Sequence, residues 1–475
     1  MIRVSNLDAG MLYAETAEMP MHTMGVLILE RPVEPIFERL RRVVEERLHL
    51  LAPFRRRLVE GPLQIGDPHW IEDPEFSVEN HLRRTAVPSP GSMRELAELV
   101  AVSASGMLDR SRPLWELQVV EGLEDGKVAV VAKIHHAAMD GGRLVSLIGT
   151  LLDLSPEGRT LPSADDSWTP DKEPSLLWLT ADAARALVTK PLHALRAATE
   201  VGASILGGVQ LQSFRRDDSA KLFEAPATPL NGALSPQRSI AMADVAFDDV
   251  KAVKRAFGTT VNDVVLAAAC GALRSWLRAR GGLPARPLVA NVPVTVRSDG
   301  DEESGNRVSM ILVHLPVRVD DPVERLLAIR AETQRAKERH GDGGGDVFRQ
   351  ATDLLTNVTV PWVLTHAIEV YARSHLADRL PFLWNLVVSN LPGPPVPLYC
   401  AGAKLLRLYP FGPVQQGSGL NLTVMSVADR LCLGALACKR MVPDVDDLAD
   451  GFVAEIALLK KAAEARAATR AGTDV

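Results

Sequence analysis

Two adjacent histidines, followed closely by an aspartate and a glycine, form the most chemically suggestive pattern in the sequence. The segment reads HHAAMDG and contains His135, His136, Asp140 and Gly141. Imidazole is the side chain best suited to accept a proton near neutral pH, so one of the two histidines is a candidate general base. Successive side chains of a strand point to opposite faces, so adjacent histidines at a strand end cannot do the same job. On spacing alone, a structural role for a histidine in this place is the more common outcome.

Other catalytic chemistries find no support in the sequence. Adjacent histidines diverge and no third histidine follows at helical spacing, so we expect no metal site. The chain has neither the GxSxG elbow of serine hydrolases nor the glycine-rich motifs GxxxxGK[ST] and GxGxxG that cradle nucleotide phosphates. The four cysteines form no CxxC pair, which favours buried thiols in a reducing compartment.

The elements that must position the histidines follow from the hydrophobic pattern. The mostly apolar run over residues 127–134 predicts a buried strand that ends at the pair. We expect helices over residues 34–51, 93–108, 143–154, 261–279, 322–339 and 445–468, and further strands over 287–296, 308–317, 383–388 and 420–427. This alternation predicts an α/β fold, in which ligands commonly lie at the ends of strands.

Composition divides the chain into three parts. The 475 residues exceed what one hydrophobic core usually serves, so we expect two domains. Residues 155–175 are rich in proline, serine and acidic residues, and an unusually apolar helix is expected over 176–211. We therefore predict an N-terminal domain over 1–154, a linker with an apolar helix over 155–238, and a C-terminal domain over 239–475.

Charge and hydropathy limit the partners. A net charge of −6 argues against a nucleic-acid-binding protein, whose surface is strongly basic. The N-terminus lacks the apolar core of a signal peptide, and no stretch is predicted to span a membrane. We expect a cytoplasmic protein, for which peripheral membrane contact remains open.

The motif HHAAMDG resembles the HHxxxDG active-site motif of the CoA-dependent acyltransferase superfamily. Further segments narrow the resemblance to the bacterial wax ester synthase/diacylglycerol acyltransferase family. They are the opening Ser5–Glu30, the PLW motif Pro113–Trp115, the NDVVLA motif Asn262–Ala267, PVTVR at Pro293–Arg297 and SNLPGP at Ser389–Pro394. Together they extend from residue 5 to residue 394, in the family's order.

The resemblance implies a fold and an activity. The fold would be two chloramphenicol-acetyltransferase-like domains, each a sheet flanked by helices, with a tunnel between them. The activity would be transfer of a long-chain acyl group from acyl-CoA to a lipid hydroxyl, giving triacylglycerol from diacylglycerol or wax ester from a long-chain alcohol. No cofactor is implied, because acyl-CoA is a co-substrate. The enzyme would contact a membrane or lipid-droplet surface. The apolar linker helix would either pack between the domains or lie on that surface.

The resemblance also assigns roles to the residues of the motif. His136 would be the general base, and His135, which faces away, would be structural. Asp140 would brace the loop through an ion pair with Arg297, and Gly141 would lie among the substrate-binding residues.

Three further residues are assigned to substrate binding. Asn262 would reach the catalytic histidine from the opposite domain, although an N-cap role is equally compatible with its position. Ser389 and Asn390 would either terminate a strand or line the acceptor side of the tunnel.

Two rival functions remain open on the sequence. One is a related HHxxxDG acyltransferase that uses another acceptor or a carrier-bound acyl donor. The other is a catalytically weak protein that binds lipid droplets or membranes.

Overall fold

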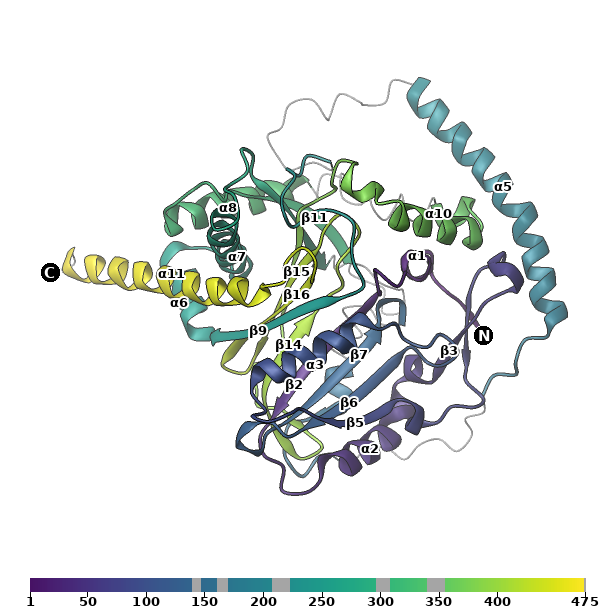
Figure 1. Ribbon diagram of the computed structural model, residues 1–475, viewed down its shortest axis with the longest axis horizontal. Coiled ribbons are helices and arrows are strands. Elements are labelled where there is room, and N and C mark those ends of the chain that lie inside the picture. Colours follow the sequence, from purple (N-terminus) through teal and green to yellow (C-terminus); the bar gives the residue numbers. More distant parts are fainter. Residues whose placement is uncertain (139–146, 160–169, 207–222, 296–307, 340–354, 474–475) are drawn as a thin grey trace.

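The computed structural model describes residues 1–138, 147–159, 170–206, 223–295, 308–339 and 355–473. It contains two large mixed sheets, each flanked by helices, as Figure 1 shows. The predicted α/β class is therefore confirmed. Asp140, Gly141 and Arg297 lie outside the described residues, so their predicted roles are not addressed by the structure.

The first large sheet carries the histidine pair. Its strands run in the order β5 (Leu82–Ala86), β6 (Trp115–Glu121), β7 (Val128–His135), β2 (His22–Leu29), β14 (Ala403–Phe411), β13 (Tyr399–Cys400) and β8 (Leu152–Asp153). A smaller sheet of β1 (Ile2–Arg3), β4 (His69–Glu72) and β3 (Arg56–Val59) lies beside it. Residues 147–151 are helical, as predicted for the end of 143–154.

Helices cover both faces of the first sheet because its strands are apolar on both sides. Helix α2 (Ile36–Arg47) packs Leu40 and Val44 against Leu117 and Val130. On the opposite face α3 (Met93–Ser105) packs against strands β2, β6 and β7. Helix α1 (Asn6–Ala14) also belongs to this half. Its short 3-10 helices are Leu48–Leu50, Ala52–Arg55, Pro62–Gln64, Val78–Asn80 and Glu124–Gly126.

The second large sheet forms the other half. Its strands run in the order β11 (Val308–Leu315), β10 (Leu288–Thr295), β12 (Leu386–Leu391), β15 (Leu420–Val427), β16 (Arg430–Cys438) and β9 (Arg238–Ala246). One face carries the larger core, against helices α6 (Phe247–Phe257), α7 (Val261–Arg278), α8 (Pro322–Arg339) and α11 (Val445–Thr473). The other face is turned toward the first half and contributes residues to a pocket between them.

Strands β13 and β14 join the two halves more closely than the predicted boundaries imply. They belong by sequence to the predicted C-terminal domain, yet β14 pairs with β2 and β13 pairs with β8 in the first sheet. Strand β9 of the second sheet begins at Arg238, one residue before the predicted boundary at 239. Residues 399–411 are thus a segment of the second half that completes the sheet of the first.

The apolar helix of the linker forms α5 (Leu176–Leu206) at the edge of the molecule, near α10 (Pro361–Arg373) (Figure 1). Lys190 holds α5 in place, since its Nζ lies 2.8 Å from Asp67 and donates to the carbonyl oxygens of Thr356 and Thr359. A short 3-10 helix (Leu376–Asp378) follows α10.

Among the described residues no single helix is long and apolar enough to cross a membrane. The pair α6 and α7 reaches the required length and composition only together, across a bend of 103°. Most of α7 is buried in the core of the second half.

Candidate active site

The histidine pair lies where β7 ends and the chain turns into a 3-10 helix, His136–Ala138. His135 is completely buried, whereas His136 is half-buried and lines the pocket between the two halves. The two rings therefore face different surroundings, as strand alternation predicts. Only His136 is placed to meet a substrate, and its role as general base stays a prediction.

The pocket has a volume of about 290 Å³ and is walled by both halves. The first half contributes side chains of α1, α2, β2, β7 and residues 147–152, and the second contributes side chains of β10, β11, β12 and β15. The crossing strand β14 adds Leu408, Pro410 and Phe411. A pocket at the junction of two sheets agrees with the expected position of a tunnel between domains.

One arm of the pocket is apolar and runs over the first sheet beneath α2. Its walls include Leu27, Leu40, Leu117, Val130, Ala132, Leu147, Leu151, Leu152 and Cys400. Burial raises the pKa of the Cys400 thiol to about 12, so it is a small apolar group here. No charged side chain lines the pocket among the described residues, which suits a hydrocarbon chain.

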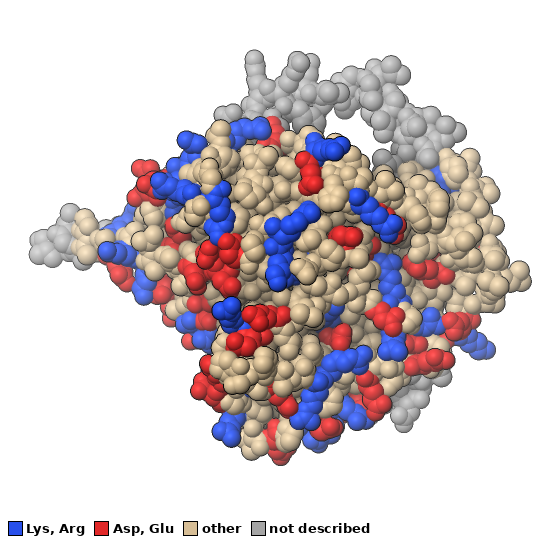
Figure 2. All heavy atoms as spheres, in the orientation of Figure 1, with Lys and Arg blue, Asp and Glu red and all other residues tan. Residues whose placement is uncertain are grey.

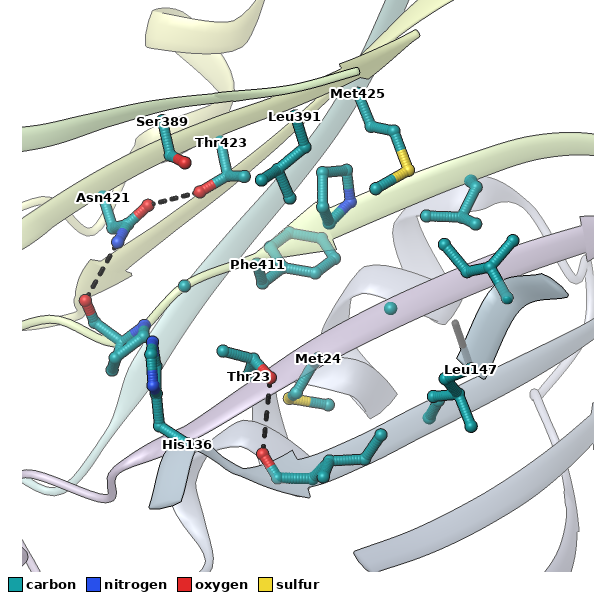
Figure 3. Close-up of a pocket in the computed structure, with 18 of the residues that line it drawn as sticks. Thr23, Met24, His136, Leu147, Ser389, Leu391, Phe411, Asn421, Thr423 and Met425 are labelled. Carbon is teal, nitrogen blue, oxygen red and sulfur yellow. Dashed lines mark hydrogen bonds between the residues drawn. The ribbon is translucent and has the colours of Figure 1, made fainter. Parts of the chain in front are cut away.

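The opposite wall has polar side chains on adjacent strands. Ser389 on β12 pairs in register with Thr423 on β15, and Asn421 precedes Thr423 by two residues on the same face. Thr423 Oγ1 donates to Asn421 Oδ1 at 2.7 Å, and Asn421 Nδ2 donates to the carbonyl of Pro413 at 2.9 Å. Figure 3 shows these three side chains on one side of the pocket, with His136 on the other. Further along the same strands Leu391 and Met425 make the wall apolar again.

A buried network beneath His136 fixes the turn that carries it. The amide of Ala137 donates to His135 Nδ1 at 3.1 Å, so the proton of the neutral His135 ring lies on Nε2. Nε2 faces Glu15 Oε1 at 3.5 Å. The same oxygen accepts the amide of Met21 at 3.0 Å, and the carbonyl of Met21 accepts the amide of His136 at 2.8 Å. Glu15 therefore contacts both sides of the turn.

Glu15 is ionised inside the protein. Burial alone would raise its pKa, but the contact with His135, the Met21 amide and the nearby Arg110 together lower the pKa to about 2. Arg110 reaches Glu15 Oε2 through Nε at 3.2 Å and Nη2 at 3.0 Å. The carboxylate thus accepts hydrogen bonds from three donors: the Met21 amide, Arg110 Nε and Arg110 Nη2. These bonds are charge-assisted, because the acceptor is ionised.

Two more titratable groups lie on the strands beneath the site. Burial lowers the pKa of Lys133 to about 8, and its Nζ donates to the carbonyls of Ser103 and Gly106 at the end of α3. His22 lies opposite His135 in the β2–β7 register, and burial followed by the charge of Lys133 lowers its pKa well below the ordinary value. These groups face away from the pocket and secure its floor.

The structure places the other predicted residues as follows. Ser389 lines the pocket, whereas Asn390, the next residue on β12, is not among the side chains that line it. Asn262 lies in the first turn of α7, where Thr260 is the N-cap and Asp263 completes a capping box. The described pocket lining does not include Asn262, so its contact with His136 stays a prediction.

Sequence reasoning missed Glu15, Asn291, Asn421 and Thr423. Glu15 lies within the family-like opening segment, but its contact with His135 requires the fold. The other three are polar residues in otherwise apolar strand sequences, and that interruption was an available signal. Among the described residues there is no group of three histidine, cysteine or acidic side chains that could hold a metal ion.

Comparison with known families and curated proteins agrees with the motif pattern. The wax ester synthase/diacylglycerol acyltransferase catalytic domain matches residues 4–265, and the C-terminal domain of the same family matches residues 304–460. A Mycobacterium tuberculosis protein provisionally named as a diacylglycerol O-acyltransferase is 34% identical over 477 residues, covering 95% of this chain and 89% of its own. A second protein from that organism with the same provisional name is 34% identical, covering 98% of this chain and 97% of its own.

Solved structures give the same picture. The wax ester synthase/diacylglycerol acyltransferase of Marinobacter aquaeolei is similar with a TM-score of 0.68 and 29% identity, covering 97% of this chain and all of that one. A condensation domain of the calcium-dependent antibiotic synthetase has a TM-score of 0.54 at 16% identity, covering 96% of this chain and 94% of that one. The second likeness shows a shared fold only.

Proposed function

Because this chain belongs to the wax ester synthase/diacylglycerol acyltransferase family, we propose that it transfers a long-chain acyl group from acyl-CoA to a lipid hydroxyl. The acceptor would be diacylglycerol, a long-chain alcohol, or both. The observation that carries the proposal is the placement of His136, the half-buried member of the pair, in an otherwise largely apolar pocket between the two halves.

The chemistry follows from that placement. His136 takes the proton of the acceptor hydroxyl while the oxygen attacks the thioester carbon. The carbon–sulfur bond then breaks, and the proton passes from His136 to the leaving sulfur, which releases CoA as the thiol. The apolar arm beneath α2 has the surface to hold the acyl chain during these steps. Neither a covalent enzyme intermediate nor a metal is needed for this exchange.

The remaining assignments belong to the same proposal. Asp140 braces the loop through Arg297, Gly141 lies beside the substrate, and Ser389, Asn390 and Asn262 contribute to substrate binding. They are supported by the family motifs that contain them and, for Ser389, by its position in the pocket lining.

The test is an ester-synthesis assay with radiolabelled palmitoyl-CoA against dipalmitoylglycerol, hexadecanol and water. His136→Ala is expected to lower kcat by about 10²–10⁴-fold, which is the usual contribution of a positioned base. His314→Ala is the matched control, because His314 is half-buried, pairs with Glu332 and lies outside the pocket lining. Full ester synthesis by His136→Ala would remove the base assignment, and transfer from acyl-carrier protein alone would favour the carrier-dependent rival.

We also propose that the enzyme works in the cytoplasm at a membrane or lipid-droplet surface, which it contacts through α5 and α10. The support is a group of exposed apolar side chains on these helices: Leu176, Leu177, Leu187, Val188 and Leu192 on α5, and Trp362, Val363 and Val370 on α10. Figure 2 shows few charged side chains where α5 lies at the right-hand edge. Leu364 of α10 packs into the cluster of α1, whose Leu7 and Met11 line the pocket. A lipid acceptor held at this face would therefore be close to the pocket.

Flotation with phosphatidylcholine–phosphatidylglycerol vesicles tests this contact. The triple variant Leu187→Ser, Val188→Ser and Val363→Ser is expected to float less than the wild type. The matched control replaces three exposed apolar residues on other helices, Val102, Leu327 and Leu458, by serine. Equal flotation of the two triple variants would contradict the assignment of α5 and α10.

A further inference from the structure

Asn291 is a polar side chain in a place where packing alone would favour an apolar one. It lies in the middle of β10 in the sequence LVANVPVT and is 1% exposed. Its neighbours in register are Leu312 on β11 and Val387 on β12. Despite this burial its side chain lines the pocket.

The amide of Asn291 is only half satisfied. Nδ2 lies 3.1 Å from the sulfur of Met310, a weak acceptor, and among the described residues Oδ1 has no hydrogen-bond partner. A buried polar atom without a partner destabilises the protein relative to one that is hydrogen-bonded. An unpartnered carbonyl oxygen on a pocket wall is therefore best explained by a ligand that donates to it.

The groups around Asn291 define what kind of ligand fits. Asn291, Val387 and Asn421 form one row across three strands, and Ser389 and Thr423 lie in the next row. Asn421 donates one N–H to the carbonyl of Pro413 and accepts the proton of Thr423, which leaves Thr423 Oγ1 as an acceptor. The wall therefore offers two acceptor oxygens, Asn291 Oδ1 and Thr423 Oγ1, besides the Ser389 hydroxyl and the second N–H of Asn421, which can donate.

A plain long-chain alcohol cannot satisfy this wall. Its single O–H must point to His136 during the reaction, so it has no donor left for Asn291 or Thr423. Asn291 and Ser389 are diagonal neighbours on adjacent strands, because Asn291 pairs with Val387, two residues before Ser389. Diagonal neighbours are about 7–8 Å apart, which two vicinal oxygen atoms and their hydrogen bonds can span. A hydroxyl on the carbon next to the reacting one would supply the missing donor.

Resting on the proposed function, we infer that Asn291 is a specificity residue that binds a second hydroxyl group of the acceptor. Diacylglycerol and plain long-chain alcohols, with one free hydroxyl each, remain acceptors, but the preferred class is then a long-chain 1,2-diol or a partial glyceride with two free hydroxyl groups. The acceptor is the substrate in question because its oxygen must meet His136, which lies across the pocket from the polar wall (Figure 3).

The experiment compares hexadecan-1-ol, hexadecane-1,2-diol and monopalmitoylglycerol as acceptors, with palmitoyl-CoA as donor. The wild-type protein is expected to use the diol and the monoglyceride about tenfold or more better in kcat/KM than the plain alcohol. Asn291→Leu should remove most of that preference, so that kcat/KM falls about tenfold more for the diol and the monoglyceride than for hexadecan-1-ol. Its Tm should equal or exceed that of the wild type, because an unsatisfied amide is replaced by an apolar group.

A second variant, Asn291→Ser, and the KM for palmitoyl-CoA make the outcome decisive. Asn291→Ser, which keeps a hydrogen-bonding oxygen, should retain part of the diol preference, and it serves if the leucine variant fails to fold. A preference that is absent in the wild type, or unchanged in both variants, overturns the inference. So does a raised KM for palmitoyl-CoA that is equal for all acceptors, because Asn291 would then bind the amide groups of the donor. Absence of ester from every acceptor would instead refute the proposed function.

Discussion

Replacing Glu15 by glutamine separates its charge from its shape. The carboxylate accepts hydrogen bonds from Met21 and Arg110 and faces His135 Nε2, so every partner is a donor. A glutamine must turn its NH₂ group toward at least one of these donors, which leaves that donor unsatisfied. The lowering of the pKa of Glu15 from 4.5 to about 2 corresponds to about 3 kcal/mol of stability, at about 1.4 kcal/mol for each pH unit.

The pH dependence of this contribution has a defined sign. Because the folded-state pKa of Glu15 is depressed, its stabilising effect is complete above pH 4.5 and is lost as the pH falls from about 4.5 to about 2. Glu15→Gln should therefore lower the free energy of unfolding at pH 7 by about 2–3 kcal/mol and flatten the acid limb of the stability profile. Urea denaturation between pH 2 and 7 measures both effects.

The same variant tests whether the buried network positions the base. Glu15 holds the two groups that secure the turn of His136, so we expect kcat to fall by about 10–100-fold, with a smaller change in KM. Glu98→Gln is the control, since Glu98 forms an exposed i,i+4 pair with Arg94 on α3 and its loss should change nothing measurable. Wild-type stability at pH 7 with an unaltered acid limb, or an unchanged kcat, would refute the reasoning.

Three further predictions concern the support of the site. Burial depresses the pKa of Lys133 from 10.5 to about 8, so the charged side chain lowers the free energy of unfolding fully below pH 8. This destabilisation disappears as the pH rises from 8 to 10.5. Lys133→Met should abolish the resulting alkaline rise in stability, which urea denaturation measures. Asp153→Asn should lower the free energy of unfolding by about 3–5 kcal/mol in a thermal melt, because buried Arg47 has Asp153 as its carboxylate partner at 2.7 Å. A small change would show that solvent reaches the pair. Gly434→Ala should destabilise the protein by about 1–3 kcal/mol, because a Cβ there would overlap the carbonyl of Pro410 on β14; an unaltered Tm would mean that the strands separate easily.

Local patterns in the sequence were sufficient for many elements. The strand 420–427 and the helix 322–339 match β15 and α8 to the residue, because strong periodicity and flanking turn residues define both ends. Strand β12 begins at Leu386 rather than at 383 and ends at Leu391, which places Ser389 inside a strand. The unpredicted strand β2 pairs in the first sheet with β7.

Long-range pairing was beyond the same reasoning. The pairing of β14 with β2 joins residues far apart in the chain, and periodicity does not specify partners. The residues of the candidate site also differ in whether local sequence patterns reveal them. The motif pointed directly to His136, whereas the Glu15 contact exists only because β7 ends beside the segment that follows α1. Asn291 is recognisable as an anomaly only when its burial and its missing partner are seen together.

The crossing of β14 limits how the enzyme can open. A hinge between the halves would have to break the ladder between β14 and β2, which runs from Leu405 to Phe411. Substrates must therefore enter and leave by movements of side chains and loops at the ends of the pocket, with the two sheets staying together. A chain cut within the linker would yield an amino-terminal fragment whose sheet lacks an inner strand, and that fragment would regain a complete sheet only by capturing the other piece.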